Sequence, residues 1–200
     1  MKKIGAIVLS ALLLVITQKP LVIYKEPDVV EVKRIAETEN EEMLYQLVYV
    51  TQEKVKQRKM ELEKQEEEAR KQQEIKEKRD TLGGEQEIEN LYKIVMAESG
   101  NQGSYGQQLV TSVVINRMQS EKYPNTITGV ITQKHQFSPV SNGTFYSAVP
   151  TQEVIDAVDT VIEEGVVTDA LYFLNPDIAS TGWTSGLTYV TTHRDHAFYK

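Results

Sequence analysis

Apolar residues after residue 85 first recur with the period of a helix. Four of them lie at positions i, i+3, i+4 and i+7: Ile88, Leu91, Tyr92 and Val95. This spacing predicts a helix with one apolar face that runs into Met96, Ala97 and Glu98. Gly100 is expected to end it, because glycine commonly terminates helices.

Three more helices are predicted in the same region. One covers residues 105–119, a short one runs from Thr126 through Ile131, and another begins after Thr151 and ends at Gly165. Thr126 and Thr151 are the expected N-caps, because a threonine hydroxyl can accept a hydrogen bond from a free backbone N–H. The expected inward faces are Leu109, Val113 and Asn116 in the first of these helices, and Val154, Ala157, Val158 and Val161 in the last.

The pattern then changes to that of strands. Residues 170–174 and 187–192 are runs of β-branched and aromatic residues, bounded by Asn175-Pro176 and by Gly182 and Gly186. Helices followed by strands predict an α+β domain over residues 85–200.

The N-terminus has the pattern of an export signal. Lys2 and Lys3 precede an apolar run from Ile4 to Ile16, and apolar character resumes at residues 21–24. The run is shorter than the roughly 20 residues that span a bilayer. Residues 1–24 are therefore interpreted as a signal peptide, which would leave the protein secreted, or as a retained signal anchor, which would hold it at the outer face of the membrane.

Residues 25–84 are interpreted as a charged helical stalk or linker. Residues 52–80 are mostly Lys, Arg, Glu and Gln, with the pairs Glu66/Arg70, Glu67/Lys71 and Glu74/Lys78 at the i, i+4 spacing that supports a solvated helix. Val48, Val55, Leu62 and Ala69 recur every seven residues, but the companion positions are polar. A single helix is favoured, with weak self-association through the stalk as the alternative. Gly83 and Gly84 are expected to form a flexible joint.

Charge and composition remove several function classes. The chain has 22 basic and 29 acidic residues, and residues 81–200 carry only 6 of the basic residues against 13 of the acidic ones. Nucleic acid is not an expected partner, because its binding surfaces are basic. The chain contains no cysteine, which excludes disulfides, thiolate zinc sites and a lipidated N-terminal cysteine.

Glu98 is the first candidate for chemistry. It ends an apolar helix and enters a glycine-containing loop, where a carboxyl group can be partly desolvated and its pKa raised, as a general acid requires. The residues alone favour an ordinary exposed or ion-paired glutamate.

His193, Asp195 and His196 form a second candidate group, with a metal site or a hydrolytic base as possible functions. Two histidines three residues apart on one strand would point to opposite faces, and the chain has only one other histidine, His135. No metal site is therefore assigned.

Several short motifs occur in a fixed order after residue 88. They are Met96-Ala97-Glu98-Ser99-Gly100, Gly106-Gln107, residues 113–117 (VVINR), residues 123–127 (YPNTI), residues 129–131 (GVI), residues 136–140 (QFSPV), residues 170–176 (ALYFLNP) and His196-Ala197-Phe198. Together they resemble the SleB/CwlJ-type cell-wall hydrolases, over about residues 88–199.

The resemblance implies a lysozyme-like or lytic-transglycosylase-like domain that cleaves peptidoglycan between N-acetylmuramic acid and N-acetylglucosamine. It implies that Glu98 is the catalytic acid and that no metal or organic cofactor is needed. Glycosidases commonly use two carboxylates, but Asn101 stands where relatives often have an acid, and Glu121 and Asp195 lie in distant segments. A single-acid lytic transglycosylase is favoured over hydrolysis by water.

Other motif residues are expected to bind the glycan. They are Ser99, Gln136, Phe137, Ser138, Tyr172, Asn175, Trp183 and His196. The polar ones can donate to or accept from hydroxyl and acetamido groups and the aromatic ones can stack on sugar rings, although core or turn roles are equally compatible with the sequence.

Two other function classes are kept as alternatives. One is a non-catalytic wall-binding or scaffold protein, which the stalk and the missing second carboxylate would suit. The other is a metal-dependent amidase or peptidase that uses His193, Asp195 and His196.

Overall fold

The computed structural model describes residues 41–178 and 182–200, and the chain divides into two compact units, Met1–Leu62 and Glu63–Lys200. The expected signal segment, residues 1–24, lies outside the described residues, as does the first part of the expected stalk. Within the described ranges, no helix is both long enough and apolar enough to cross a membrane.

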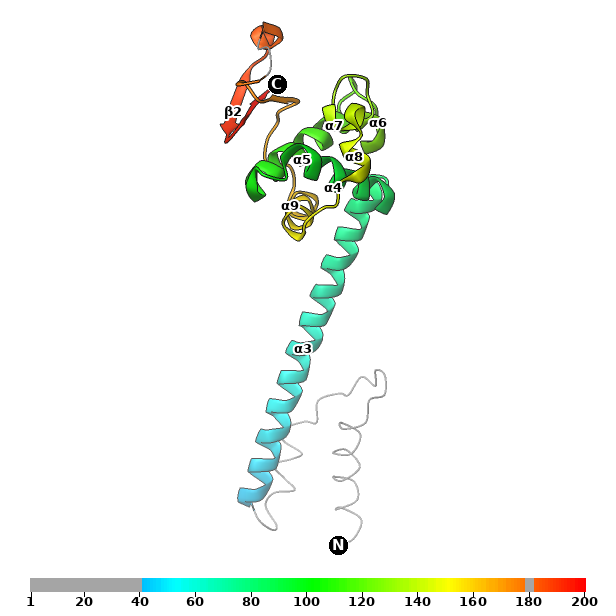
Figure 1. The fold of residues 1–200 in the computed structure, drawn as a ribbon. Coiled ribbons are helices and arrows are strands. Elements are labelled where there is room, and N and C mark those ends of the chain that lie inside the picture. Colours follow the sequence, from blue (N-terminus) through cyan, green and yellow to red (C-terminus); the bar gives the residue numbers. More distant parts are fainter. Residues whose placement is uncertain (1–40, 179–181) are drawn as a thin grey trace. The chain divides into compact units, whose positions relative to one another are not determined.

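The charged segment forms one helix, α3 (Glu41–Thr81), as its composition predicted (Figure 1). Of the predicted pairs, Lys78 and Glu74 form an ion pair with a 3.0 Å N···O distance. Arg70 instead pairs with Glu67, one turn away at i, i+3, at 2.7 Å. Both pairs are exposed, so each contributes little to stability.

The turn after α3 is more constrained than its two glycines predict. Gly83 and Gly84 have φ values of 102° and 81°, which only glycine adopts without strain. Arg79 bridges this turn: its guanidinium donates to Glu85 at 2.9 Å and to Asp159 Oδ1 at 2.8 Å. Lys78 Nζ also donates to the Glu163 carbonyl, at 2.6 Å. The interactions of the folded domain thus extend back to Lys78, before the expected domain start at residue 85.

Six helices follow. They are α4 (Glu85–Ser99), α5 (Gly103–Gln119), α6 (Ile127–Ile131), α7 (Ser138–Asn142), α8 (Thr144–Ser147) and α9 (Gln152–Glu164). The four predicted helices are confirmed, and Thr126 and Thr151 cap α6 and α9 through their hydroxyls. The short helices α7 and α8 were not predicted, because four or five residues are too few to show a period and neither helix has a side-chain cap of the kind that marks α6.

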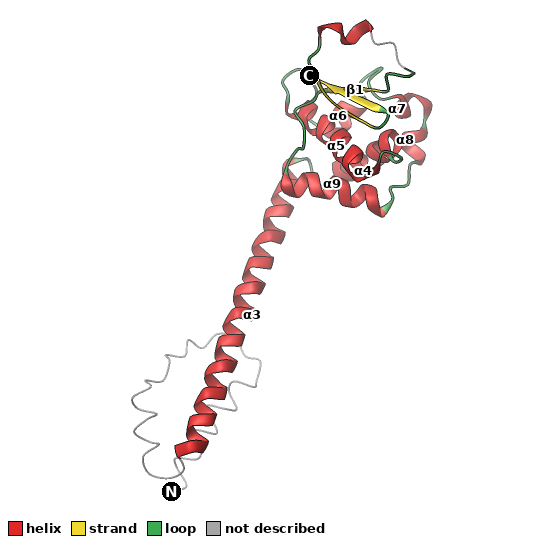
Figure 2. Cartoon of the chain, turned by 90° about the vertical axis from the view of Figure 1, so that its left-hand side faces the viewer, coloured by secondary structure: helices red, strands yellow, loops and turns green. Residues whose placement is uncertain are grey.

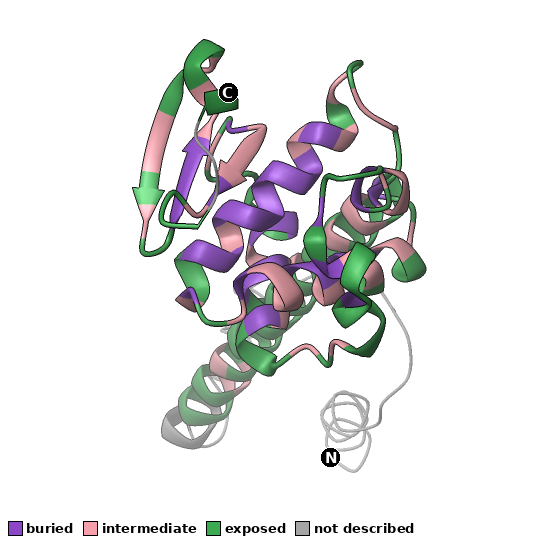
Figure 3. Cartoon of the chain, turned by 45° about the horizontal axis from the view of Figure 1, so that its top comes forward, coloured by how far each residue is buried: buried purple, intermediate pink, exposed green. Residues whose placement is uncertain are grey.

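Helix α5 is the central element of the domain. It packs against α4, α6, α9 and β1, and Figure 3 shows it buried along most of its length. The predicted inward stripe of Leu109, Val113 and Asn116 was too narrow, since Val110 and Val114 on other faces are also fully buried. Asn116 donates to the carbonyls of Thr168 and Ala170, and these bonds hold the chain that leads into the sheet.

The sheet has three short antiparallel strands, which Figure 2 shows in yellow. They are β1 (Tyr172–Leu174), β2 (Tyr189–His193) and β3 (His196–Tyr199), with β3 in the middle, and the 3₁₀ turn η1 (Gly182–Gly186) precedes β2. Residues 194 and 195 form a two-residue turn that places His193 directly opposite His196. The expectation that the two histidines point to opposite faces was wrong, because directly opposed residues on paired strands share a face.

Candidate active site

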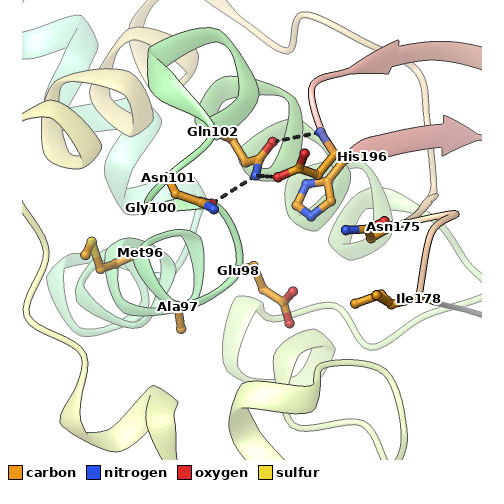
Figure 4. Close-up of a pocket in the computed structure, with 10 residues that line it drawn as sticks. Met96, Ala97, Glu98, Gly100, Asn101, Gln102, Asn175, Ile178 and His196 are labelled. Carbon is orange, nitrogen blue, oxygen red and sulfur yellow. Dashed lines mark hydrogen bonds between the residues drawn. The ribbon is translucent and has the colours of Figure 1, made fainter.

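An open cavity of about 660 Å³ lies where the C-terminal end of α4 meets the β2–β3 hairpin (Figure 4). Its lining comes from three parts of the chain: the end of α4 with the α4–α5 loop, the segment after β1, and the hairpin. The lining residues are Met96, Ala97, Glu98, Gly100, Asn101, Gln102, Asn175, Ile178, Asp195 and His196.

The last turn of α4 contributes Met96, Ala97 and Glu98 to the lining, which we call the α4 wall, and Glu98 is its acidic residue. Its side chain projects from the last turn of α4 into the open space of the cavity (Figure 4). Among the described residues it makes no hydrogen bond and no ion pair. Burial raises the pKa of this carboxyl to about 7, and only the positive charge of Arg117 opposes that shift. Glu98 can therefore hold a proton close to neutral pH, and no described residue hydrogen-bonds to its carboxyl group.

Arg117 is the charged residue behind the acid. It is 4% exposed, its Nε donates to the Leu171 carbonyl at 2.6 Å, and its guanidinium carbon lies 5.2 Å from the ring centres of Tyr123 and Phe137 and 5.7 Å from that of Tyr172. Arginine stays ionised even when buried. The sequence analysis missed its electrostatic effect on Glu98, although a lone arginine in the apolar run of residues 113–117 was an available signal.

The α4–α5 loop is fastened to the hairpin by a set of hydrogen bonds. Gln102 Nε2 donates to Asp195 Oδ2 at 3.0 Å, and Asp195 N donates back to Gln102 Oε1 at 3.3 Å. His193 Nε2 lies 3.0 Å from the Gln102 carbonyl, and Arg194 Nη1 donates to the Asn101 carbonyl at 2.8 Å. These bonds fix the part of the lining formed by Asp195 and His196, which we call the hairpin wall, relative to the end of α4.

A glycine permits this close approach. A Cβ on Gly106 would lie 2.6 Å from Gln102 Cβ and 2.9 Å from His193 Cδ2. Both distances are below any normal carbon contact, so a side chain at this position would push the hairpin and the loop apart.

Some of the predicted site residues meet in the cavity. Glu98, Asn175 and His196 come from three separate segments and surround one space (Figure 4). Asn175 Oδ1 accepts a hydrogen bond from the backbone N–H of Asp177 at 2.9 Å. This bond does not use the side-chain NH₂ group, which can therefore donate to a ligand in the cavity. Asp195, which the sequence analysis placed in a distant segment, also lines the cavity.

Others lie elsewhere. Ser99 is fully buried and its hydroxyl donates to the Val95 carbonyl at 2.9 Å, so the expectation that it contacts substrate was wrong. Phe137 is 3% exposed and packs on Phe173 in the core, so it offers no face to a sugar. Gln136 and Ser138 are exposed beside the start of α7 and do not line the cavity.

Tyr172 and Trp183 remain accessible aromatic candidates. Their rings meet edge to face with centroids 5.9 Å apart, and Trp183 is 51% exposed. An exposed indole supported by a second ring can stack on a sugar.

The histidines and the aspartate of the hairpin do not form a metal-binding cluster. His193 Nε2 and the Asp195 carboxylate are both engaged by Gln102. Within residues 41–178 and 182–200, no three His, Cys, Asp or Glu side chains come together as a ligand set.

The chain matches the family described as Cell Wall Hydrolase over residues 101–199. It is 31% identical over 117 residues to a spore cortex-lytic enzyme of Bacillus cereus and 30% identical over 113 residues to one of Bacillus subtilis. These alignments cover 57% and 56% of this chain but 44% and 37% of the relatives. The chain thus spans less than half the length of the curated relatives it matches.

Two solved structures are similar to this domain. The catalytic domain of a germination-specific lytic transglycosylase, SleB from Bacillus anthracis, has a TM-score of 0.53 and 30% identity, covering 58% of this chain and 96% of that one. The catalytic domain of the Bacillus cereus SleB protein has a TM-score of 0.53 and 32% identity, covering 57% and 89%. The helix-rich domain with its small sheet therefore belongs to the SleB-type cell wall hydrolase family.

Proposed function

We propose that the chain is an exported enzyme that cleaves peptidoglycan glycan strands between N-acetylmuramic acid and N-acetylglucosamine, as a lytic transglycosylase with Glu98 as its single acid and base. The observation that carries this proposal is the carboxyl group of Glu98, which lines the cavity, bonds to none of the residues that the structure describes and has a pKa raised to about 7. The Cell Wall Hydrolase match begins at residue 101, so the role of Glu98 rests on this environment and on the motif of residues 96–100.

The reaction needs one group that first gives and then takes a proton. Protonated Glu98 donates its proton to the glycosidic oxygen, the bond from that oxygen to C1 of muramic acid breaks, and the N-acetylglucosamine side leaves as an alcohol. The Glu98 carboxylate then takes the proton of the muramic C6 hydroxyl while O6 bonds to C1. The product ends in a 1,6-anhydro ring, and Glu98 is protonated again.

The position of Arg117 suits the second half of this cycle. Its charge stabilises the Glu98 carboxylate that exists after the first proton transfer, because burial weakens the screening of opposite charges by water. Burial and Arg117 act in opposite directions on Glu98, and their balance holds its pKa near neutrality, where an acid–base group is most effective.

A second mechanism has a specific observation in its favour. Asp195 lines the same cavity, so it is the candidate to activate a water molecule in a hydrolytic reaction. Its carboxylate is already an acceptor for Gln102 Nε2, a structural use that favours the single-acid mechanism. Glu121, the other acid considered from the sequence, is exposed and does not line the cavity.

The substrate must lie outside the membrane, so we include export in the proposal. In it, residues 1–24 act as signal peptide or signal anchor, residues 25–84 as stalk and residues 85–200 as the catalytic domain. N-terminal sequencing of the protein from membrane and soluble fractions tests this part of the proposal. A membrane-bound form that still begins at Met1 indicates an anchor, and a soluble form that has lost the first residues indicates a cleaved signal peptide.

Mass spectrometry of the fragments released from purified peptidoglycan tests the activity. We expect muropeptides that end in anhydromuramic acid, from cortex or from vegetative wall. Reducing ends would overturn the single-acid mechanism and point to Asp195. Binding to insoluble peptidoglycan without release from either source would overturn the enzyme proposal in favour of a wall-binding or scaffold protein.

A further inference from the structure

His196 has an unusual environment for a polar side chain. It is 9% exposed, and its ring lies 5.2 Å from the Phe173 ring and 6.2 Å from the Phe198 ring. Its position is fixed, because β3 is the central strand and the preceding Asp195 is held by Gln102. Such a ring cannot turn away from the cavity without disrupting the hairpin.

The two ring nitrogens differ in their surroundings. Nδ1 is enclosed and has no hydrogen-bond partner in the described structure. Nε2 is not among the enclosed unpartnered atoms and bonds to no described residue, while the ring as a whole lines the cavity. The nitrogen that faces the cavity is therefore Nε2.

The proton of a neutral imidazole can sit on either nitrogen. A buried N–H without an acceptor is rarer in proteins than a buried lone pair without a donor, so the enclosed Nδ1 is the better place for the lone pair. Burial among the phenylalanines lowers the pKa of His196, with Asp195 opposing and His193 reinforcing the shift, and this favours the neutral ring.

We infer that His196 is a substrate-binding residue which presents a fixed Nε2–H donor to the cavity, where it binds an amide carbonyl oxygen of the glycan. This inference rests on the proposed function for its substrate. Amide carbonyls are strong acceptors, and each acetamido group of an aminosugar chain supplies one. Figure 4 shows His196, Asn175 and Glu98 around the same space, so a sugar held by the donors of the first two would lie beside the acid.

Nuclear magnetic resonance of the full chain tests the donor independently of activity. The chain has three histidines, so histidine labelled with ¹⁵N gives few signals, and the His196→Asn variant assigns the one of interest. We expect the neutral ring with its proton on Nε2 at pH 7. A neutral ring with its proton on Nδ1 would overturn the inference whether or not the protein cleaves peptidoglycan.

A matched pair of substitutions tests the role in binding. Glutamine places an amide NH₂ near the position of histidine Nε2, whereas asparagine places it near Nδ1. We expect His196→Gln to keep kcat/KM on soluble glycan fragments within about threefold and His196→Asn to lose about tenfold, the effect of one hydrogen bond. Melting temperatures check that both variants fold.

The possible failures are distinguishable. Equal activity of the two folded variants would overturn the donor role while wild-type cleavage still supported the proposed function. If the wild type cleaves nothing, titration with N-acetylglucosamine oligomers decides instead: a shift of the His196 Nε2 signal supports the donor, and an unchanged signal overturns it.

Discussion

Both walls of the cavity carry a carboxyl group. Among the described residues Glu98 on the α4 wall has no hydrogen-bond partner, whereas Asp195 on the hairpin wall is bonded to Gln102. Burial raises the pKa of Glu98 to about 7 in spite of the opposing positive charge of Arg117. Asp195 is exposed and takes part in a two-way exchange of hydrogen bonds with one side chain. Two acids in one cavity can thus have different roles, because the carboxyl of Glu98 is largely buried whereas that of Asp195 accepts a hydrogen bond from Gln102.

The largest effect is expected when Glu98 is replaced by a residue that cannot donate a proton. Glu98→Gln keeps the shape of the side chain but cannot donate a proton, so we expect release of soluble muropeptides to fall by at least about 100-fold, a typical effect of losing an acid catalyst. Glu89→Gln on the same helix is the matched control, since Glu89 is exposed, forms an ion pair with Lys93 and does not line the cavity. Substantial activity in a folded Glu98→Gln protein would remove Glu98 from the mechanism.

The next largest effect is expected from separating the two walls. Gly106→Ala places a Cβ against Gln102 and His193, so we expect a loss of about 1–3 kcal/mol in the free energy of unfolding together with reduced activity. Gly186→Ala is the control, because nothing lies within 4 Å of the added atom. Urea denaturation measures both, and similar results for the two variants would contradict the tight fit described above.

A smaller effect is expected on the pH dependence. Activity requires protonated Glu98, so kcat/KM falls as pH rises through its pKa of about 7. Removal of the Arg117 charge raises that pKa further, and Arg117→Met is expected to move this limb of the pH profile to higher pH. Arg117→Lys keeps the charge and is expected to leave the limb closer to its wild-type position. A limb that moves to lower pH in Arg117→Met would contradict the assigned electrostatics.

The smallest effect is expected on the hairpin wall. Asp195→Asn removes the charge but keeps an oxygen that can accept from Gln102, so we expect activity within about threefold of wild type. A loss comparable to that of Glu98→Gln would mean that both walls supply a catalytic carboxyl group and that water is the nucleophile.

Sequence patterns predicted the α4 wall better than the hairpin wall. The spacing of Ile88, Leu91, Tyr92 and Val95 is local, and it correctly placed Glu98 at the end of a helix. Thr126 and Thr151 were also correctly predicted as N-caps, because a capping side chain bonds to a backbone N–H within three residues of its own position.

The hairpin wall depends on contacts between distant residues. The bonds from Gln102 to Asp195 and His193 join positions more than 90 residues apart, and no period in the sequence records them. The same reason explains the error over Ser99: its place in a sequence motif suggested a ligand contact, whereas its helical position points its hydroxyl to the Val95 carbonyl in the interior.

The most direct test of the account is the pKa of Glu98 itself. Carbon NMR of the side-chain carboxyl in ¹³C-glutamate-labelled protein, assigned by the signal that disappears in Glu98→Gln, follows its titration from pH 4 to pH 9. The account predicts a midpoint near 7, so that the acid still holds its proton close to neutral pH. A midpoint near the ordinary glutamate value of about 4.3 would contradict the claim that the cavity holds a general acid ready to act.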